Sequence, residues 1–227
     1  MKPYYKKIGI FMIGLLFLVL SFNFMYETKD SCLARPVAGK GDYLFELKGW
    51  RWEEYAKELI VYSLEGTKKE VYSRNISALN PWKLASGDVT GDGQDEISIG
   101  VYKESPLHPV MAKRPFIYGF NGKDILPVWR GSRLSRPFED YLIIDIDNDG
   151  ISEIVASEYL DNGNMVINSY KWKGFGFEGY LESSELDLIA AINESNGRVI
   201  VDGVLNGEDF RAHVGVGSEM LEWEELQ

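Results

Sequence analysis

The 227-residue chain contains few of the residues that build redox centres, soft-metal sites and nucleic-acid interfaces. Cys32 is its only cysteine, so no disulfide can form within the chain and a metal–thiolate cluster is excluded. The chain also lacks an excess of positive charge. Its formal net charge is −11, whereas a nucleic-acid-binding protein needs a basic face that releases counterions from the phosphates. We therefore expect no nucleic-acid partner.

The common catalytic motifs are missing as well. His108 and His213 are the only histidines, and they do not form the closely spaced pair of a metalloprotease. The sequence has no Gly-x-Ser-x-Gly nucleophile elbow and no glycine-rich phosphate loop. A glycosidase needs only two carboxylates, and acidic residues are plentiful here. The residue types therefore favour a non-enzymatic protein and leave an enzyme that acts on polysaccharide as the alternative.

The N-terminus carries a long apolar run. Three lysines lie within the first seven residues, and residues 8–24 are then apolar apart from two glycines, Ser21 and Asn23. A helix of that length rises roughly 25 Å, near the lower limit for crossing a bilayer. A cleaved signal peptide has the same design, but the residues after the run are too bulky for a typical cleavage site. We predict a signal anchor over residues 1–27 with the rest of the chain outside the cytoplasm; a secreted protein is the alternative.

Two acidic stretches repeat along the chain. Residues 145–154 read Asp-Ile-Asp-Asn-Asp-Gly-Ile-Ser-Glu-Ile, and residues 88–97, which begin 57 positions earlier, read Asp-Val-Thr-Gly-Asp-Gly-Gln-Asp-Glu-Ile. Oxygen donors at positions 1, 3 and 5, a backbone carbonyl at 7 and a glycine at the sharp turn are the pattern that wraps calcium. Position 12 holds no glutamate and the flanks are β-formers, so the EF-hand is excluded.

The spacing assigns ligands in both stretches, with Ca²⁺ as the predicted structural ion. In the second stretch, four side chains are the predicted ligands and Ile151 offers its carbonyl; the side chains are Asp145, Asp147, Asp149 and Glu153. In the first, Gln94 offers the carbonyl and the side chains are Asp88, Thr90, Asp92 and Glu96. Thr90 supplies a neutral oxygen, so the first site should bind more weakly, unless Asp95 compensates. The alternative is an acidic turn without an ion, satisfied by its own backbone amides.

The rest of the chain reads as short strands. Residues 28–41 show no periodicity and are predicted to be an exposed linker, and the folded domain is expected over residues 42–227. One unit of that domain reads strand, acidic loop, strand, long loop over Glu104–Lys113, strand, Asn121-Gly122 turn, strand. Four strands in such a unit are close to a propeller blade of roughly 40–50 residues. The fold prediction is all-β, with about four four-stranded blades.

The two motifs, Gly87–Ile97 and Ile144–Ile154, resemble the FG-GAP and VCBS repeat family of calcium-loop β-propeller blades, found in integrin alpha-subunits and in exported bacterial proteins. The resemblance covers roughly residues 81–172. It implies that each loop joins two neighbouring strands and holds calcium. The chain is too short for seven blades, so a closed four-bladed ring, an open arc and a ring completed by another chain all stay open.

These observations predict a membrane-anchored extracytoplasmic module that recognises a protein or a glycan. The alternatives are the polysaccharide-acting enzyme and a structural subunit that completes a propeller with another chain. The six tryptophans suit blade cores, although a sugar-binding face would use the same residues.

Overall fold

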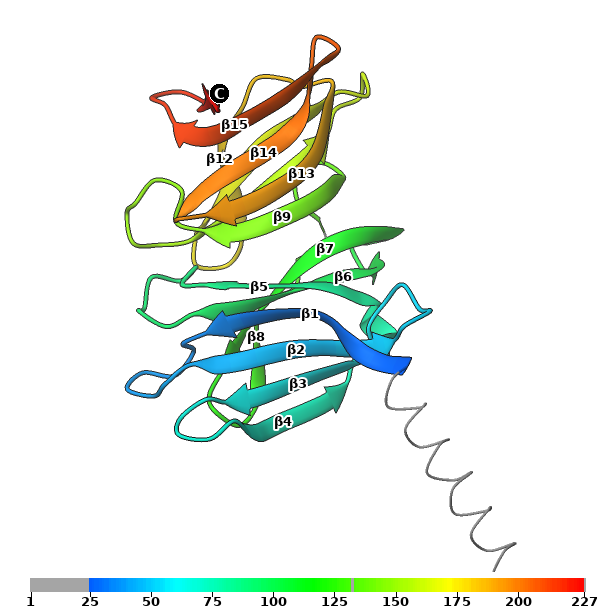
Figure 1. Ribbon diagram of the computed structural model, residues 1–227, viewed down its shortest axis with the longest axis vertical. Coiled ribbons are helices and arrows are strands. Elements are labelled where there is room, and N and C mark those ends of the chain that lie inside the picture. Colours follow the sequence, from blue (N-terminus) through cyan, green and yellow to red (C-terminus); the bar gives the residue numbers. More distant parts are fainter. Residues whose placement is uncertain (1–24, 132, 227) are drawn as a thin grey trace, which may run out of the picture.

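A computed structural model describes residues 25–131 and 133–226 (Figure 1). These residues form β-strands and a single turn of 3₁₀ helix, η1 (Ser77–Leu79). The strands are β1 (Tyr26–Ala34), β2 (Tyr43–Trp50), β3 (Glu58–Ser63), β4 (Lys69–Asn75), β5 (Pro81–Gly87), β6 (Glu96–Ser105), β7 (His108–Phe120), β8 (Ile125–Trp129), β9 (Phe138–Ile144), β10 (Glu153–Tyr159), β11 (Met165–Trp172), β12 (Phe177–Glu182), β13 (Leu188–Ser195), β14 (Arg198–Leu205), β15 (Glu208–Val216) and β16 (Leu221–Glu225).

The strands form four sheets, each built from four consecutive antiparallel strands: β1 to β4, β5 to β8, β9 to β12, and β13 to β16. The prediction of an all-β chain in units of four strands is confirmed. Tight turns keep each meander in register. The β13–β14 and β14–β15 connections use Asn196-Gly197 and Asn206-Gly207, with φ of 53° and 74° and of 54° and 80°. Two residues at positive φ make the hairpin turn whose twist matches that of the strands.

Apolar faces press successive sheets together. Phe45 and Val61 of the first sheet meet Ile99 and Phe116 of the second in one buried core. A second core lies between the second and third sheets and a third core between the third and fourth. The first strands β1, β5, β9 and β13 lie beside one another in that order. In the described part of the chain the first and fourth sheets share none of these cores, so the sheets do not close into a ring.

The predicted linker over residues 28–41 is wrong for its first half, because residues 26–34 form strand β1. The strand is missed because the adjacent charged residues Lys29 and Asp30 interrupt the alternation of apolar residues that marks a strand in the sequence. Thr28 and Asp30 flank a shift in the pairing with β2, and the Asp30 carboxylate accepts a hydrogen bond from the backbone N–H of Leu84 at 2.6 Å. The folded domain therefore begins at Tyr26 rather than at residue 42.

The predicted long loop over Glu104–Lys113 is also wrong, because β6 and β7 continue through it as a hairpin. Arg114, which is fully buried, holds the hairpin together. Its guanidinium donates to the carbonyl oxygens of Lys103 and Val110, both at 2.8 Å, and of His108 at 3.1 Å. Side-chain donors thus supplement the strand pairing where the prolines of this segment cannot donate.

The predicted membrane anchor over residues 1–27 lies almost wholly outside the described residues. Among the described residues, none belongs to a helix with the length and apolar character needed to cross a bilayer.

Removal of β1 tests the revised boundary. A fragment that starts at Gly41 should fail to melt cooperatively, because it leaves one edge of β2 unpaired and uncovers part of the first core. A fragment of residues 25–227 is the matched control. Circular dichroism melts and gel filtration compare them, and an equally cooperative melt of the shorter fragment would contradict the role of β1.

Candidate metal centre

The two acidic stretches occupy equivalent places in the fold. The first joins β5 to β6 and the second joins β9 to β10, which are the first two strands of the second and third sheets. In each case the ninth residue of the motif pairs with the residue before the first aspartate: Glu96 with Gly87, and Glu153 with Ile144. The sheet register therefore folds each loop back on itself. We refer to residues 88–96 as the first loop and to residues 145–153 as the second loop.

The first-position aspartates organise the turns. The two carboxylate oxygens of Asp145 accept from the backbone N–H groups of Asp149 and Gly150 at 3.0 and 2.9 Å. Asp88 accepts the matching N–H groups of its own loop at 3.1 and 2.7 Å. A carboxylate that accepts several backbone N–H groups fixes a tight turn without any ion. The two loops thus share one backbone design, as their repeated sequence predicts.

The ninth-position glutamates are drawn inward. Glu153 is fully buried and Glu96 nearly so. One oxygen of Glu153 accepts from the N–H of Ile146 at 3.0 Å, and one oxygen of Glu96 accepts from the N–H of Val89, also at 3.0 Å. Both side chains thereby cross the base of their loop and tie its start to its end.

The seventh-position residues are held in their loops by their backbone N–H groups. The N–H of Ile151 donates to Asp149, and the N–H of Gln94 donates to Asp92, both at 2.9 Å. The Gln94 side chain also accepts from the N–H of Ala38 at 3.3 Å, which ties the first loop to the segment after β1. The role of the two seventh-position carbonyl groups as calcium ligands stays a prediction.

The second loop gathers its carboxylates around one point. Oxygens of Asp145, Asp147 and Asp149 lie within 4.8 Å of one another. The ammonium of Lys171, on β11, lies among them. Its Nζ is 2.6 Å from an oxygen of Asp147, 2.6 Å from one of Asp149 and 3.4 Å from Oε1 of Glu153. A cation of the protein itself therefore stands at the place where the motif would hold an ion.

The charges of this cluster shift one another. Burial alone would lower the pKa of Lys171, but its hydrogen bonds to Asp147 and Asp149 raise it. The hydrogen bond from Lys171 lowers the pKa of Asp149. Burial, together with the charge of Asp147, raises the pKa of Glu153 to about 7. A nearby cation would favour the charged form of Glu153, which burial disfavours.

The first loop has no such cluster. Among the described residues only the second loop brings three metal-binding side chains this close together. In the first loop Thr90 stands at position 3, and its hydroxyl donates to Oε1 of Glu96 at 3.1 Å. Asp95 points elsewhere, since its carboxylate accepts from the N–H of Arg35 at 2.6 Å. Compensation by Asp95 at the first site stays a prediction.

The two loops also touch each other, which the linear motif does not predict. The N–H of Ser152 donates to the carbonyl oxygen of Asp88 at 2.7 Å. A Cβ atom at Gly87 would come within 2.6 Å of the Ser152 hydroxyl and 2.8 Å of Ile143. Gly87 therefore allows the third sheet to approach the second. The glycine that precedes the first motif is the one sequence signal of this contact.

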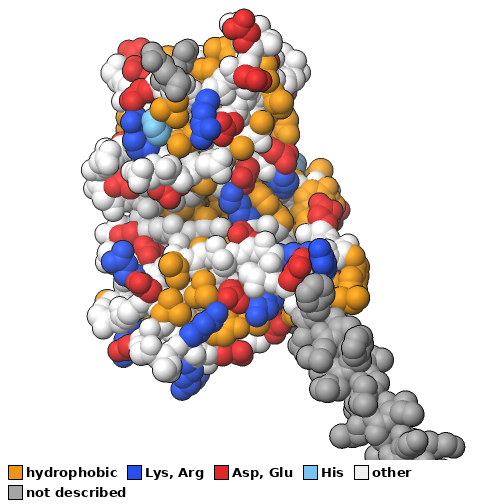
Figure 2. All heavy atoms as spheres, viewed as in Figure 1, with side chains coloured by type: hydrophobic (Ala, Val, Ile, Leu, Met, Phe, Trp, Pro, Cys, Tyr) orange, Lys and Arg blue, Asp and Glu red, His pale blue; other side chains and the backbone are white. Residues whose placement is uncertain are grey.

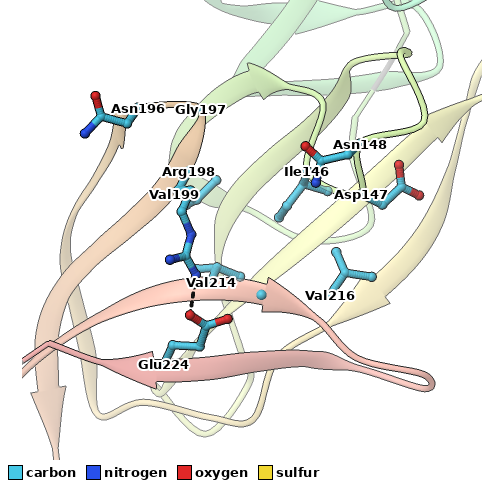
Figure 3. Close-up of a pocket in the computed structure, with 11 residues that line it drawn as sticks. Ile146, Asp147, Asn148, Asn196, Gly197, Arg198, Val199, Val214, Val216 and Glu224 are labelled. Carbon is cyan, nitrogen blue, oxygen red and sulfur yellow. Dashed lines mark hydrogen bonds and ion pairs between the residues drawn. The ribbon is translucent and has the colours of Figure 1, made fainter.

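A hollow of about 530 Å³ opens between the second loop and the fourth sheet (Figure 3). Asp147 and Asn148 line it from the loop, and Val216 and an Arg198–Glu224 ion pair line it from the fourth sheet. The wall is mainly polar, with a few apolar side chains. Such a wall suits a polar ligand that also offers some apolar surface.

The residues of the second loop fit a hard divalent cation. Three aspartates converge on it above the buried Glu153, and two buried oxygens, Asp147 Oδ1 and Glu153 Oε1, have no hydrogen-bond partner. Oxygens of this kind are the ligands that calcium prefers. The first loop fits less well, because Thr90 replaces the third-position aspartate and three metal-binding side chains do not gather among its described residues.

Comparisons with known proteins give no family. The chain matches no protein-family model, and no curated protein matches it.

The loop design predicts a loss of stability when its first aspartate is removed. Asp145→Ala should lower the free energy of unfolding by about 1–3 kcal/mol in the presence of EDTA, because two backbone N–H groups lose a charged acceptor. Asp209→Ala, at an exposed aspartate of β15, is the control and should stay within about 0.5 kcal/mol of the parent. Urea unfolding measures both. Equal stability of Asp145→Ala and the parent would show that the carboxylate does not organise the turn.

Proposed function

We propose that the chain is a membrane-anchored extracytoplasmic binding module. In this proposal it is an open β-propeller-like array of the FG-GAP and VCBS type, whose acidic loops hold calcium and whose outer end recognises a protein or a glycan. The observation that carries the proposal is the shared construction of the two loops. Both join the first two strands of neighbouring sheets, and both fold around the same carboxylate-to-backbone hydrogen bonds.

The position of the loops supports an outward-facing role. The apolar run of residues 8–24 ends immediately before β1, so an anchor there would hold the start of β1 close to the bilayer. The acidic loops lie at the opposite end of the strands (Figure 1). The residue after β1 lies beside the first loop, since the N–H of Arg35 donates to Asp95. The loops and the hollow beside them would then face away from the membrane.

The end of the body that faces the membrane in this proposal carries suitable side chains. Trp52 is 66% exposed and stacks on Trp50 with ring centroids 5.3 Å apart, and Trp50 packs edge-on against Tyr26. Leu107, in the β6–β7 turn, is 88% exposed. Apolar side chains are visible at this end in Figure 2. Tryptophan and tyrosine are enriched where proteins meet the membrane interface.

The surroundings of the hollow favour recognition over catalysis. A glycosidase needs two free carboxyl groups that converge on a substrate. The two acidic residues of this hollow are already paired, Asp147 with Lys171 and Glu224 with Arg198. Most tryptophans outside the membrane-facing end pack in or beside the cores; for example, Trp129 meets Phe177 at 5.1 Å. The hollow therefore suits the binding of a protein or glycan better than it suits glycosidase catalysis.

A structural subunit remains the second candidate, because the four sheets are not closed. A second chain would then complete the ring. Light scattering on the full chain in detergent tests this alternative: a single chain per particle would contradict it.

Calcium should stabilise the full-length chain in detergent. Millimolar calcium should raise the thermal midpoint relative to EDTA, because an ion that binds only the folded state shifts the equilibrium toward it. The double substitution Asp145→Ala and Asp149→Ala should remove most of that rise. A midpoint that ignores calcium in the parent would contradict the calcium part of the proposal.

The ligand itself is tested by display and capture. A glycan array and a pull-down with the full-length chain in calcium should give a signal that Val216→Arg removes, because this substitution fills the hollow. Leu126→Arg, at an exposed position of β8 that does not line the hollow, is the control. Loss of binding in both variants, or in neither, would place the ligand elsewhere.

A further inference from the structure

We propose that Lys171 is the built-in cation of the second loop, and that calcium binds there only by displacing its ammonium group. This inference rests on the proposed calcium binding and concerns the regulation of that same site. Lys171 would make the second loop a competitive site, closed by a lysine when calcium is scarce and opened by calcium when it is abundant.

The contacts of Lys171 carry the inference. Its ammonium lies 2.6 Å from Asp147, 2.6 Å from Asp149 and 3.4 Å from Glu153, which are three of the four predicted side-chain ligands. The fourth, Asp145, is held by backbone N–H groups. An ammonium and a calcium ion cannot share this position, since both need the same oxygens and their charges repel.

Glu153 supplies an independent sign that the position is built for a cation. Its side chain is fully buried, and its Oε1 has no hydrogen-bond partner. The same oxygen lies 3.4 Å from the ammonium of Lys171, an ion pair that supplies no hydrogen bond. A buried carboxylate oxygen left in this state is costly, and a closer divalent cation would remove that cost. Lys171 thus offsets the negative charge of the loop but leaves Oε1 of Glu153 without a hydrogen bond.

The side chain of Lys171 is able to leave. It is 20% exposed, and its ammonium also lies 4.5 Å from the ring of Tyr180 on the neighbouring strand β12. The ammonium already makes this cation–π contact, and the flexible four-carbon stem can turn it away from the carboxylates while it stays near the ring. The displaced state therefore needs no change of the backbone.

The second sheet shows what the loop is like without the lysine. Tyr170 pairs with Ile154 in the third sheet, and Tyr118 pairs with the equivalent Ile97 in the second. The residue after each tyrosine is therefore equivalent, and in the second sheet it is Gly119. The first loop has no internal ammonium and uses the Thr90 hydroxyl instead. The ligand count alone predicts that the second loop binds calcium more tightly; competition by Lys171 would reduce or reverse that difference.

Lys171→Met tests the displacement, because it removes the charge and keeps most of the stem. Isothermal calorimetry with calcium chloride, on the full-length chain in detergent, should show a second-loop dissociation constant at least about tenfold lower than in the parent, equivalent to about 1.4 kcal/mol. In EDTA the same variant should melt at a lower temperature than the parent, since the carboxylates have lost their counterion. Adding Asp149→Ala should abolish the gain in affinity, which assigns it to the second loop.

Lys173→Met is the matched control, because Lys173 is an exposed lysine in the turn after β11. It removes the same charge from the same end of the molecule and should change calcium affinity less than about twofold. If Lys171→Met does not fold in EDTA, Lys171→Gln, which keeps a neutral donor, decides instead. Equal affinity of the parent and the Lys171 variant would overturn the displacement while leaving calcium binding intact. No calcium binding by any of these proteins would overturn the proposed calcium sites themselves.

Discussion

Mutual repulsion of four carboxylates within one short loop is the constraint on which the second loop depends. Each of them would be easy to solvate alone, but the sheet register brings Glu153 back against the start of the loop and buries it. The protein offsets the repulsion in two ways. Backbone N–H groups donate hydrogen bonds to Asp145, and the ammonium of Lys171 forms ion pairs with Asp147 and Asp149. The first loop meets the same constraint with one carboxylate fewer and a hydroxyl in its place.

Much of the fold follows from the sequence because its signals are local. Alternating apolar residues and Asn-Gly turns locate most strands, and the repeated motif locates the joints between them. Two segments escape that reasoning, for one shared physical reason. Asp30 in β1 and Arg114 in β7 are charged residues whose partners are backbone groups far away in the chain or across a hairpin. A charge satisfied by tertiary contacts looks, in the sequence alone, like a charge that needs water.

The candidate site divides in the same way. The spacing of the acidic residues predicts two similar loops, and the matching carboxylate-to-backbone hydrogen bonds show that similarity, whereas calcium in them stays a prediction. Lys171 lies 18 residues beyond Glu153, on a strand whose register depends on the whole sheet, so spacing gives no hint of it. Only the alignment of Tyr170 with Tyr118 reveals that the two loops differ there, with a lysine against Gly119. The repeated motif predicts the features that the two loops share, whereas the residue on the third strand of each sheet, Lys171 or Gly119, makes them differ.

Asp147 links the two proposals for this end of the molecule. Its carboxylate holds Lys171, and the same residue lines the hollow shared with the fourth sheet. Exchange of a singly charged ammonium for a doubly charged calcium ion would make the wall of that hollow more positive. An anionic group of a ligand would then bind more tightly when calcium is present. By linkage, the ligand would strengthen calcium binding by the same factor, so cation and ligand would each report on the other. A loop that only stapled two strands together would not need to face a hollow, whereas a loop that couples two ligands would.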